Sequence, residues 1–494
     1  MYLKRKIDTY LAGWKAVGKL FDNEQYTKAY SRAEELYKEA VRFGDSRNML
    51  AGAFHMARIE AEYRENAADS ALNRYLSLID RLDAVDQALC HAFIARFYQE
   101  YSTASRWIIR SNEATDEAEL DYKLWPQERF DSEIERHIGL ALKDKAALQA
   151  APIESAAAFC SKPLGDGLLT TPTLYDLVMN LAIECLNPSE QLRLIDELVD
   201  FHKTDEVCLR VWLDLWRLSI EASVPNRAAP TAETYMQYAE KYGTACEMVT
   251  KFNYRAAMLL FEQQRYVEAK ELCDKAVAIF PESEGGLECS NLVSRIQDRE
   301  CSVKMVREEL SAHAMLAVTT CRNVETVYFR IIKPFDHIRV YDHKEIVELM
   351  AKQKPLKEWS QAAPRRDDYR EQKIYTYLPE MEAGEYYLLI SASGDFRSEG
   401  LSYGEFVCCN AQIVSVLDDN ALRGYLVRRT DGQPIAGQTV RLDHYDYKKN
   451  RYESTGVTAT TDAEGYYQFD NQQSNGSGSL RVSTVIDGMT LSSG

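Results

Sequence analysis

The sequence predicts a multidomain protein in which helices precede strands: an irregular α-solenoid followed by two antiparallel β-sandwich domains. Apolar residues recur every three to four positions up to about residue 300 and every second position after it, and these are the periods of helices and of strands. Near the end, residues 424–442 read GYLVRRTDGQPIAGQTVRL, a strand–turn–strand pattern. The predicted domains are residues 1–300, 301–411 and 412–494, the last of them truncated.

Composition and charge set the outer limits. The chain has 494 residues, of which 46% are hydrophobic and 27% charged, so it is long enough for several cores. Its formal net charge of -17 disfavours nucleic acid and anionic membrane surfaces as partners, because binding to phosphate depends on Lys and Arg. No apolar run reaches the roughly 18 to 20 residues of a membrane span, and the first residues lack the apolar centre of a signal peptide. We therefore expect a soluble chain without a transmembrane segment. We also expect the chain to be a fragment of a longer protein.

Apolar stripes at helical spacing mark the first part of the chain. One stripe joins Ala29, Ala33, Leu36 and Ala40, and others follow the same spacing. Thr171-Pro172 reads as an N-cap with proline at the first helical position, opening a helix that runs to about Cys185. Asn187-Pro188 is expected to end that helix. The pattern indicates paired amphipathic helices.

The clearest repeat lies between Phe252 and Pro281. Its small, aromatic and proline positions match a tetratricopeptide helix pair, and they are occupied by Ala257, Tyr266, Ala269, Ala276 and Pro281. Other parts match less well, so we expect a tetratricopeptide-like solenoid of six to eight helix pairs, some of them degenerate. Such a stack is either a concave peptide-binding surface or a spacer and packing platform, and the sequence leaves both open.

After residue 300 the pattern is that of half-buried antiparallel strands. Residues 326–331 and 386–391 alternate between two faces. Between them, residues 344–361 are predicted to form a short helix and 362–373 a solvated connection whose charge run lies on the surface. A second sandwich begins near Gln412.

That second sandwich is marked by its turns. The predicted turns are one at Asp431-Gly432, a corner at 434–437, one before Gly465 and a flexible one at 474–479.

Residue clusters that could carry chemistry all have a structural explanation. His337, His343 and Glu345 lie close together without a third fixed ligand, so a solvated strand edge is the favoured interpretation over a metal site. Adjacent Cys408 and Cys409 should point to opposite faces of a strand and pack independently. Asp462–Glu464 is expected to form the turn before Gly465. The sequence assigns no catalytic, cofactor-binding or metal-binding residue and no cofactor, and it predicts that the chain is not an enzyme.

Eleven cysteines are scattered along the chain without a paired CxxC motif. Most have apolar helical neighbours, where thiols behave as small buried hydrophobes. A disulfide scaffold is therefore not expected. Taken alone, this composition favours a reducing compartment.

Several segments, taken in their order, resemble the N-terminal region of bacterial alpha-2-macroglobulin-like proteins, particularly the large ones of Bacteroidetes. In the strand region, residues 323–332 (NVETVYFRII), 355–359 (PLKEW) and 378–390 (LPEMEAGEYYLLI) resemble the first β domain of that family. In the helical region the similar runs are TLYDL at 173–177 and YVEAKELCDKAVAIFPESEG at 266–285. The segments GQPIAGQTVRL and TDAEGYYQF resemble its next sandwich, and they also occur in carboxypeptidase-regulatory-like and other prealbumin-like modules.

This resemblance implies a protein of the periplasm or cell surface that takes part in trapping or inhibiting proteases. A Cys-x-Glu-Gln thioester motif is not present in these residues, so covalent capture is not assigned to them. The implied role is that of a non-catalytic N-terminal scaffold and protein-interaction region, with proteases or envelope proteins as partners. The alternative is an adaptor or cell-surface adhesion protein whose solenoid binds a peptide or protein partner. A hydrolase is the least favoured class.

Overall fold

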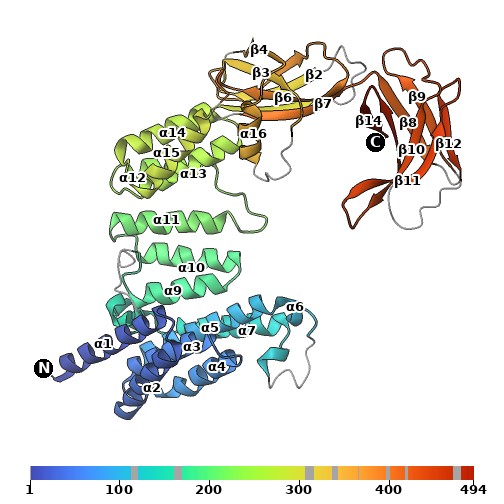
Figure 1. The fold of residues 1–494 in the computed structure, drawn as a ribbon. Helices are drawn as coiled ribbons and strands as arrows, with labels where there is room; N and C mark the ends of the chain where they lie inside the picture. Colours follow the sequence, from blue (N-terminus) through green and yellow to red (C-terminus); the bar gives the residue numbers. More distant parts are fainter. Residues whose placement is uncertain are drawn as a thin grey trace. The chain divides into compact units, whose positions relative to one another are not determined.

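The computed structural model describes residues 2–112, 121–160, 170–305, 316–335, 343–364, 366–396, 401–417, 421–470 and 480–493 (Figure 1). The chain divides into two compact units. The first comprises Met1–Leu260 and Glu271–Ser290, and the second Phe261–Lys270 and Asn291–Gly494. The predicted order of helices first and antiparallel sandwiches second is confirmed.

Fifteen α-helices precede the first strand in the described residues, as expected for six to eight helix pairs (Figure 1). Their bounds are α1 (Tyr2–Asp22), α2 (Tyr26–Phe43), α3 (Ser46–Ala61), α4 (Ala67–Leu78), α5 (Ala84–Ala104), α6 (Arg106–Ile109), α7 (Gln127–Ala141), α8 (Lys145–Ala150), α9 (Leu174–Cys185), α10 (Pro188–Phe201), α11 (Val207–Glu221), α12 (Ala232–Tyr242), α13 (Val249–Glu262), α14 (Tyr266–Ile279) and α15 (Glu284–Gln297). No helix among the described residues is both long enough and apolar enough to cross a membrane.

Local capping residues set where these helices begin. Asp45 accepts a hydrogen bond from the backbone N–H of Asn48 and so caps α3. Thr173 and Asp176 form a reciprocal capping box at the start of α9. The predicted N-cap at Thr171-Pro172 is therefore wrong by two residues, because the carbonyl of Pro172 accepts from the N–H of Ile153 and holds that stretch extended.

The end of α9 at Cys185 agrees with the prediction. Asn187 then caps α10 by accepting from the backbone N–H groups of Ser189 and Glu190, with Pro188 at the first helical position.

The predicted apolar stripes face the core of the helical unit. Ala29, Ala33, Leu36 and Ala40 of α2 are all buried. In the tetratricopeptide-like pair, Ala257, Ala269 and Ala276 are fully buried, and the ring centroid of Tyr266 lies 5.0 Å from that of Phe261. Small side chains at these positions allow helices to approach closely.

Fourteen β-strands and one further helix follow in the described residues. Their bounds are β1 (Glu300–Met305), β2 (Leu316–Arg322), β3 (Thr326–Ile332), α16 (His343–Ala351), β4 (Lys357–Ala362), β5 (Gln372–Tyr377), β6 (Gly384–Ser391), β7 (Ser402–Cys408), β8 (Ala411–Leu417), β9 (Ala421–Arg428), β10 (Thr439–Asp446), β11 (Arg451–Thr460), β12 (Tyr466–Asp470), β13 (Leu480–Ile486) and β14 (Met489–Ser492).

The first sandwich consists of an antiparallel sheet of order β1-β2-β5 and another of order β4-β3-β6-β7. Val327, Phe329 and Ile331 of β3 are fully buried in its core, as the alternation predicts. The helix predicted over 344–361 is wrong in its second half. It ends at Ala351, and the residues after Pro355 form β4, because the residue before a proline is biased away from helix.

Strand β6 differs from the expected half-buried strand because both of its faces are covered. Tyr386, Leu388 and Ile390 face the sandwich core. Tyr387 and Leu389 pack in a second apolar cluster that includes residues of α16. The helix thus explains why every residue from Tyr386 to Ser391 is buried.

The second sandwich consists of a sheet of order β12-β9-β8 and another of order β11-β10-β13-β14. Strands β9 and β10 belong to different sheets, so the Asp431-Gly432 turn and the 434–437 corner carry the chain from one sheet to the other. Gly437 has a φ of 70°, a conformation that favours glycine. Residues 474–479 lie outside the described residues.

Candidate functional site

The residues that the sequence singled out for chemistry lie apart or have structural partners. His337 and the side chain of His343 lie outside the described residues, while Glu345 is exposed on α16. Cys408 packs in the core of the first sandwich and Cys409 in that of the second, in agreement with the prediction. Within the described ranges, no group of three or more His, Cys, Asp or Glu side chains is placed to hold a metal ion.

The carboxylate of Asp462 organises the turn that the sequence predicts before Gly465. It accepts from the backbone N–H groups of Glu464, at 3.0 Å, and Tyr466, at 2.8 Å. Gly465 has a φ of 74° and donates its N–H to the Asp462 carbonyl. The predicted turn is confirmed.

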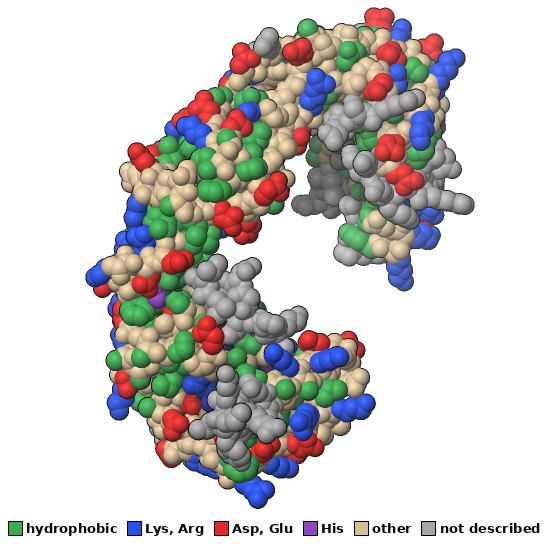
Figure 2. Space-filling view, turned by 90° about the vertical axis from the view of Figure 1, so that its left-hand side faces the viewer, with side chains coloured by type: hydrophobic (Ala, Val, Ile, Leu, Met, Phe, Trp, Pro, Cys, Tyr) green, Lys and Arg blue, Asp and Glu red, His purple; other side chains and the backbone are tan. Residues whose placement is uncertain are grey.

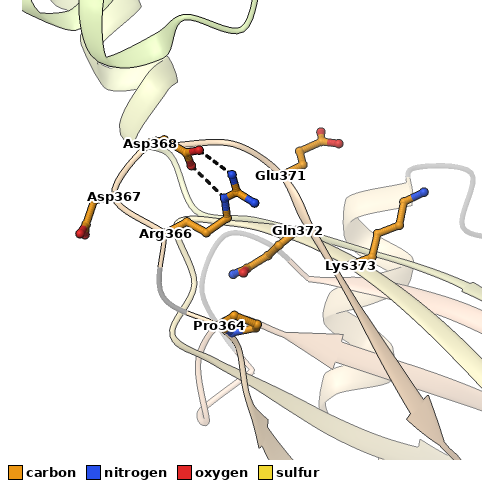
Figure 3. Close-up of a pocket in the computed structure, with 7 residues that line it drawn as sticks. All are labelled: Pro364, Arg366, Asp367, Asp368, Glu371, Gln372 and Lys373. Atoms are coloured by element: carbon orange, nitrogen blue, oxygen red, sulfur yellow. Dashed lines mark hydrogen bonds and ion pairs between the residues drawn. The ribbon is translucent and has the colours of Figure 1, made fainter.

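The charge run between β4 and β5 lines a shallow pocket, in which Arg366 and Asp368 form an ion pair (Figure 3). The Arg366 guanidinium donates to both carboxylate oxygens of Asp368, at 2.9 and 2.5 Å. This pair holds the pKa of Asp368 well below its usual range. Arg366 and Asp367 are exposed, as predicted. The arrangement leaves no convergent set of groups for catalysis.

Buried His137 and half-buried His91 connect two helices of the helical unit. The Nδ1 atoms of His91 and His137 lie 2.8 Å apart, and burial, reinforced by Arg136, lowers the pKa of His137 to about 3. Both rings are held neutral near pH 7, since burial also lowers the pKa of His91. A neutral pair of this kind ties α5 to α7.

A different site remains on the helical unit, where α3, α4, α5 and α9 leave a hollow of about 760 Å³. We call it the alanine hollow, because six alanines line it. They are Ala57, Ala61, Ala67, Ala68, Ala71 and Ala104. Alanine side chains end at Cβ, so the helices enclose space that larger residues would fill. Aromatic rings complete the wall, and those of Phe54 and Phe93 lie 5.2 Å apart.

A second hollow, of about 790 Å³, adjoins the first. We call it the tryptophan hollow, because Trp212 and Trp216 of α11 line it with ring centroids 5.1 Å apart. Ile183, Leu215 and Met248 add aliphatic surface. Polar and charged side chains line the rest of the hollow, so an apolar surface stands beside groups that can orient a ligand.

The two hollows meet at Glu184, which lines both. The guanidinium of Arg96 on α5 donates to the carboxylates of Glu100 and Glu184, so a group of one cation and two carboxylates lies between the hollows. Lys251 in the tryptophan hollow is likewise paired, with Glu284 at 2.6 Å and with Glu288 at 2.9 Å.

Two polar groups of the tryptophan hollow lack such partners among the described residues. The Oδ1 atom of Asn180 is buried without a hydrogen bond, although its Nδ2 donates to Thr171 at 3.4 Å. Arg255 is exposed and makes no ion pair within the described part of the chain. Burial raises the pKa of Tyr235 in the same lining, and the charge of Arg255 opposes that shift. The hollow therefore presents one unsatisfied acceptor and one uncompensated cation.

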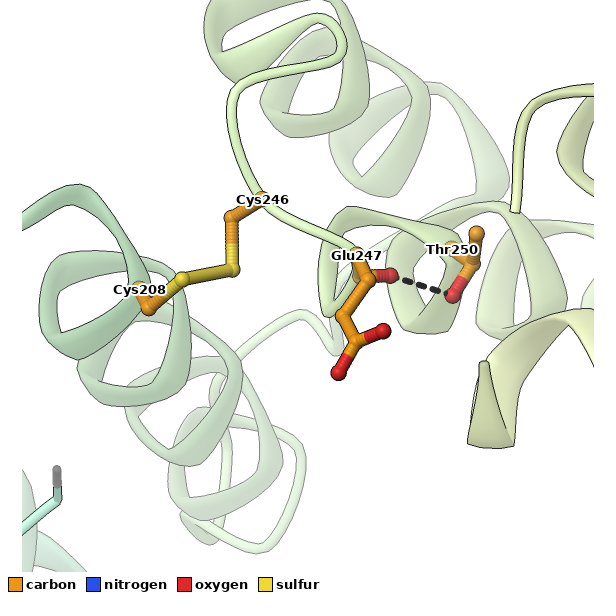
Figure 4. The surroundings of a disulfide bond; sticks show 4 residues. All are labelled: Cys208, Cys246, Glu247 and Thr250. Atoms are coloured by element: carbon orange, nitrogen blue, oxygen red, sulfur yellow. Dashed lines mark hydrogen bonds between the residues drawn. A yellow bond between two sulfur atoms is a disulfide. The ribbon is translucent and has the colours of Figure 1, made fainter. Parts of the chain in front are cut away.

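A disulfide between Cys208 and Cys246 fixes one wall of the tryptophan hollow (Figure 4). Cys208 lies in the first turn of α11, and Cys246 precedes α13, with their Cα atoms 5.5 Å apart. The link connects the helix that carries both tryptophans to the segment that carries Met248. The expectation of independent buried thiols is wrong for this pair, although the other nine cysteines form no disulfide.

Sequence reasoning did not find either hollow. The available signal was the spacing of Trp212 and Trp216, which places two large rings on one face of a helix.

Figure 2 shows one face of the molecule, where hydrophobic, acidic and basic side chains alternate without a large patch of one charge.

No sequence profile of a known family matches the chain, and no curated protein matches it. Two similar structures are of native alpha-2-macroglobulin from Escherichia coli. One spans domains MG0-NIE-MG1, with 15% identity, a TM-score of 0.28 and coverage of 39% of this chain and 63% of that chain.

The other Escherichia coli structure spans domains NIE-MG1, with 15% identity, a TM-score of 0.25 and coverage of 39% of this chain and 96% of that chain. A tetra-tandem repeat in the extending region of a large adhesion protein is also similar. It has 13% identity and a TM-score of 0.17, and the match covers 40% of this chain and 48% of that chain. At these TM-scores the likenesses carry no argument about function.

Proposed function

We propose that this chain is a non-catalytic scaffold and protein-interaction region of an alpha-2-macroglobulin-like protein that acts in the periplasm or at the cell surface. In this proposal the chain has three domains, residues 1–300, 301–411 and 412–494. The helical domain binds a protein partner, and the sandwiches support the parts of a protease-trapping inhibitor that lie elsewhere.

The observation that carries the proposal is where the family-like segments lie. Residues 323–332, 355–359 and 378–390, which resemble the first β domain of that family, include or border β3, β4 and β6. These strands are direct neighbours in one sheet, with Phe329 opposite both Trp359 and Ile390. Three segments that are separate in sequence thus contribute to one layer, which supports treating them as one domain.

A protease assay tests the non-inhibitory role. The chain is incubated at an equimolar ratio with trypsin or a subtilisin, and residual cleavage of a large protein substrate is measured beside a known protein inhibitor. We expect no stoichiometric loss of protease activity. Strong inhibition by this chain alone would contradict the proposal that the protease-trapping parts lie outside it.

Cell fractionation tests the compartment. The tagged product of the complete gene is expected in the periplasmic or envelope fraction, and recovery in the cytosol would contradict the proposed location.

The alternative is an adaptor or adhesion protein without a link to proteases, and the two hollows of the helical unit favour it. Both hollows are lined by residues of the helical unit, and their apolar side chains form surfaces to which no sandwich residue contributes. A Cys-x-Glu-Gln motif elsewhere in the complete gene product would favour the inhibitor, and a product without one would favour the adaptor.

A further inference from the structure

We propose that the tryptophan hollow binds an extended peptide segment of a partner protein, with an apolar side chain against Trp212 and Trp216 and a carboxylate facing Arg255. This inference rests on the interaction role proposed above and adds the chemistry of the partner. It is carried by the lining, by one unsatisfied amide and by one uncompensated charge.

The lining selects for an apolar side chain. Trp212, Leu215 and Trp216 come from α11, Ile183 from α9, and Met248 from the segment before α13. Aromatic side chains at the floor of a pocket provide a large contact area at small cost in conformational entropy. Because the disulfide joins α11 to the segment before Met248, these walls are held together before a ligand arrives.

The amide of Asn180 selects for a hydrogen-bond donor. Its Oδ1 is buried and unpaired in the described chain, and an unsatisfied buried acceptor is costly. A backbone N–H of an extended peptide meets this requirement, because its donors and acceptors are not used internally. A fatty acid would match the apolar lining and Arg255 but would supply no N–H.

The charges select for a carboxylate. Lys251 is paired with Glu284 and Glu288, and Glu184 is paired with Arg96. Arg255 alone among these cations has no acidic partner in the described residues. A phosphate-rich polymer is disfavoured, because Glu184 and Glu284 also line the hollow. A single Asp or Glu beside an apolar residue fits this balance.

Selection from a phage-displayed library of random dodecapeptides on the immobilised chain tests the inference. The most enriched peptide is then synthesised, and its dissociation constant is measured by fluorescence anisotropy together with quenching of tryptophan emission. We expect enriched peptides to combine Asp or Glu with a large apolar residue. The Arg255→Glu variant should bind about tenfold or more weakly.

The matched control is Arg193→Glu, the same charge change at an exposed α10 residue outside the hollow, which should leave binding unchanged. Asn180→Leu should also weaken binding, and circular dichroism checks that each variant is folded. Because Arg255 is exposed, its substitution tests the inference even where Trp216→Ala fails to fold.

Three outcomes would overturn the inference. They are the absence of any enriched peptide, binding that is indifferent to Arg255→Glu, and displacement of the peptide by micromolar oleate. Enriched peptides that quench tryptophan emission but lack carboxylates would refute only the stated chemistry and leave the interaction role standing. The non-inhibitory scaffold role and the compartment are tested separately, by the protease and fractionation experiments.

Discussion

The helical unit and the sandwiches differ in how their elements are joined. Among the described residues, eight buried acidic or histidine side chains lie in the helical unit: His55, Glu60, Asp86, Glu133, His137, Asp176, His202 and Asp214. In the sandwiches the buried charged residues are Arg322 and Asp443. A helix satisfies its own backbone, so side chains must link it to the next one, whereas strands are joined by backbone hydrogen bonds.

This difference predicts which kinds of change should destabilise each unit. Side-chain charge, pH and redox state should act on the helical unit, and loss of apolar volume should act on the sandwiches. The following changes test that division, starting with those of the largest expected effect.

Glu60 is the strongest test in the helical unit. Its side chain is fully buried and pairs with Arg64 at 2.6 Å and Arg74 at 3.0 Å. Glu60→Ala should cost about 3–5 kcal/mol in unfolding free energy, because it leaves the largely buried guanidinium of Arg74 without its acidic partner. Urea unfolding followed by circular dichroism measures this. The exposed Glu35→Ala is the control, and equal effects of the two would contradict the prediction.

Phe329 is the corresponding test in the first sandwich. It is fully buried, and its ring stacks on that of Trp359 at 5.1 Å. Phe329→Ala should cost about 3–5 kcal/mol through lost apolar contact and a cavity. The effect should be confined to the transition of the sandwiches, monitored by near-ultraviolet signals. If the variant instead shifted the unfolding transition of the helical unit, the predicted difference between the units would be wrong.

The disulfide comes next. Cys208 and Cys246 close a separation of 38 residues, for which the chain-entropy account gives about 2–4 kcal/mol. Cys208→Ser, or a reducing agent, should lower the unfolding free energy of the helical unit by about that amount. Cys90→Ser removes a thiol that forms no disulfide and leaves the Cys208–Cys246 bond in place, so it should still lose stability on reduction, whereas Cys208→Ser should show no further loss. Unchanged stability of the wild type under reduction would contradict the prediction.

A pH effect should follow from His202. Burial opposes its charge, but hydrogen bonds of 2.6 Å to Asp176 and to Asp205 prevail and raise its pKa. A raised folded-state pKa contributes stability that is full below pH 6.5 and is lost as the pH rises through the folded-state pKa. His202→Asn should therefore destabilise the helical unit more at pH 6 than at pH 9. The reverse order would show that the folded-state pKa is not raised.

The smallest effect is expected from the exposed loop of the first sandwich. The Arg366–Asp368 pair is solvent-exposed on both sides, and such pairs contribute less than about 1 kcal/mol. Asp368→Asn should leave the unfolding free energy within that margin, measured by thermal denaturation. A larger loss would mean that the loop helps to hold the sandwich together.

Much of the fold could be predicted because burial follows simple periods. Ala29 to Ala40 and Val327 to Ile331 are buried as their spacing requires. What could not be predicted depends on tertiary contacts. The chain after Pro355 forms a strand because β3 offers it an edge to pair with, and β6 is buried on both faces because α16 covers it.

The candidate site was less predictable than the fold. The sequence indicated a helical stack with an open choice between binding surface and spacer. The alanine hollow arises where alanines from three helices meet, and one wall of the tryptophan hollow is held by a disulfide between residues 38 positions apart. Neither the convergence of helices nor the distance between two cysteines can be read from periodicity alone.

The disulfide also has a mechanical consequence. If the molecule is pulled from its two ends, the segment between Cys208 and Cys246 cannot be drawn out, since the tension passes through the sulfur–sulfur bond. The fully stretched length of the oxidised chain is then shorter than that of the reduced chain by roughly 130 Å, the span of 38 extended residues. In a protein that carries domains under tension, the disulfide would keep α12, which lies between the two cysteines, from being extended.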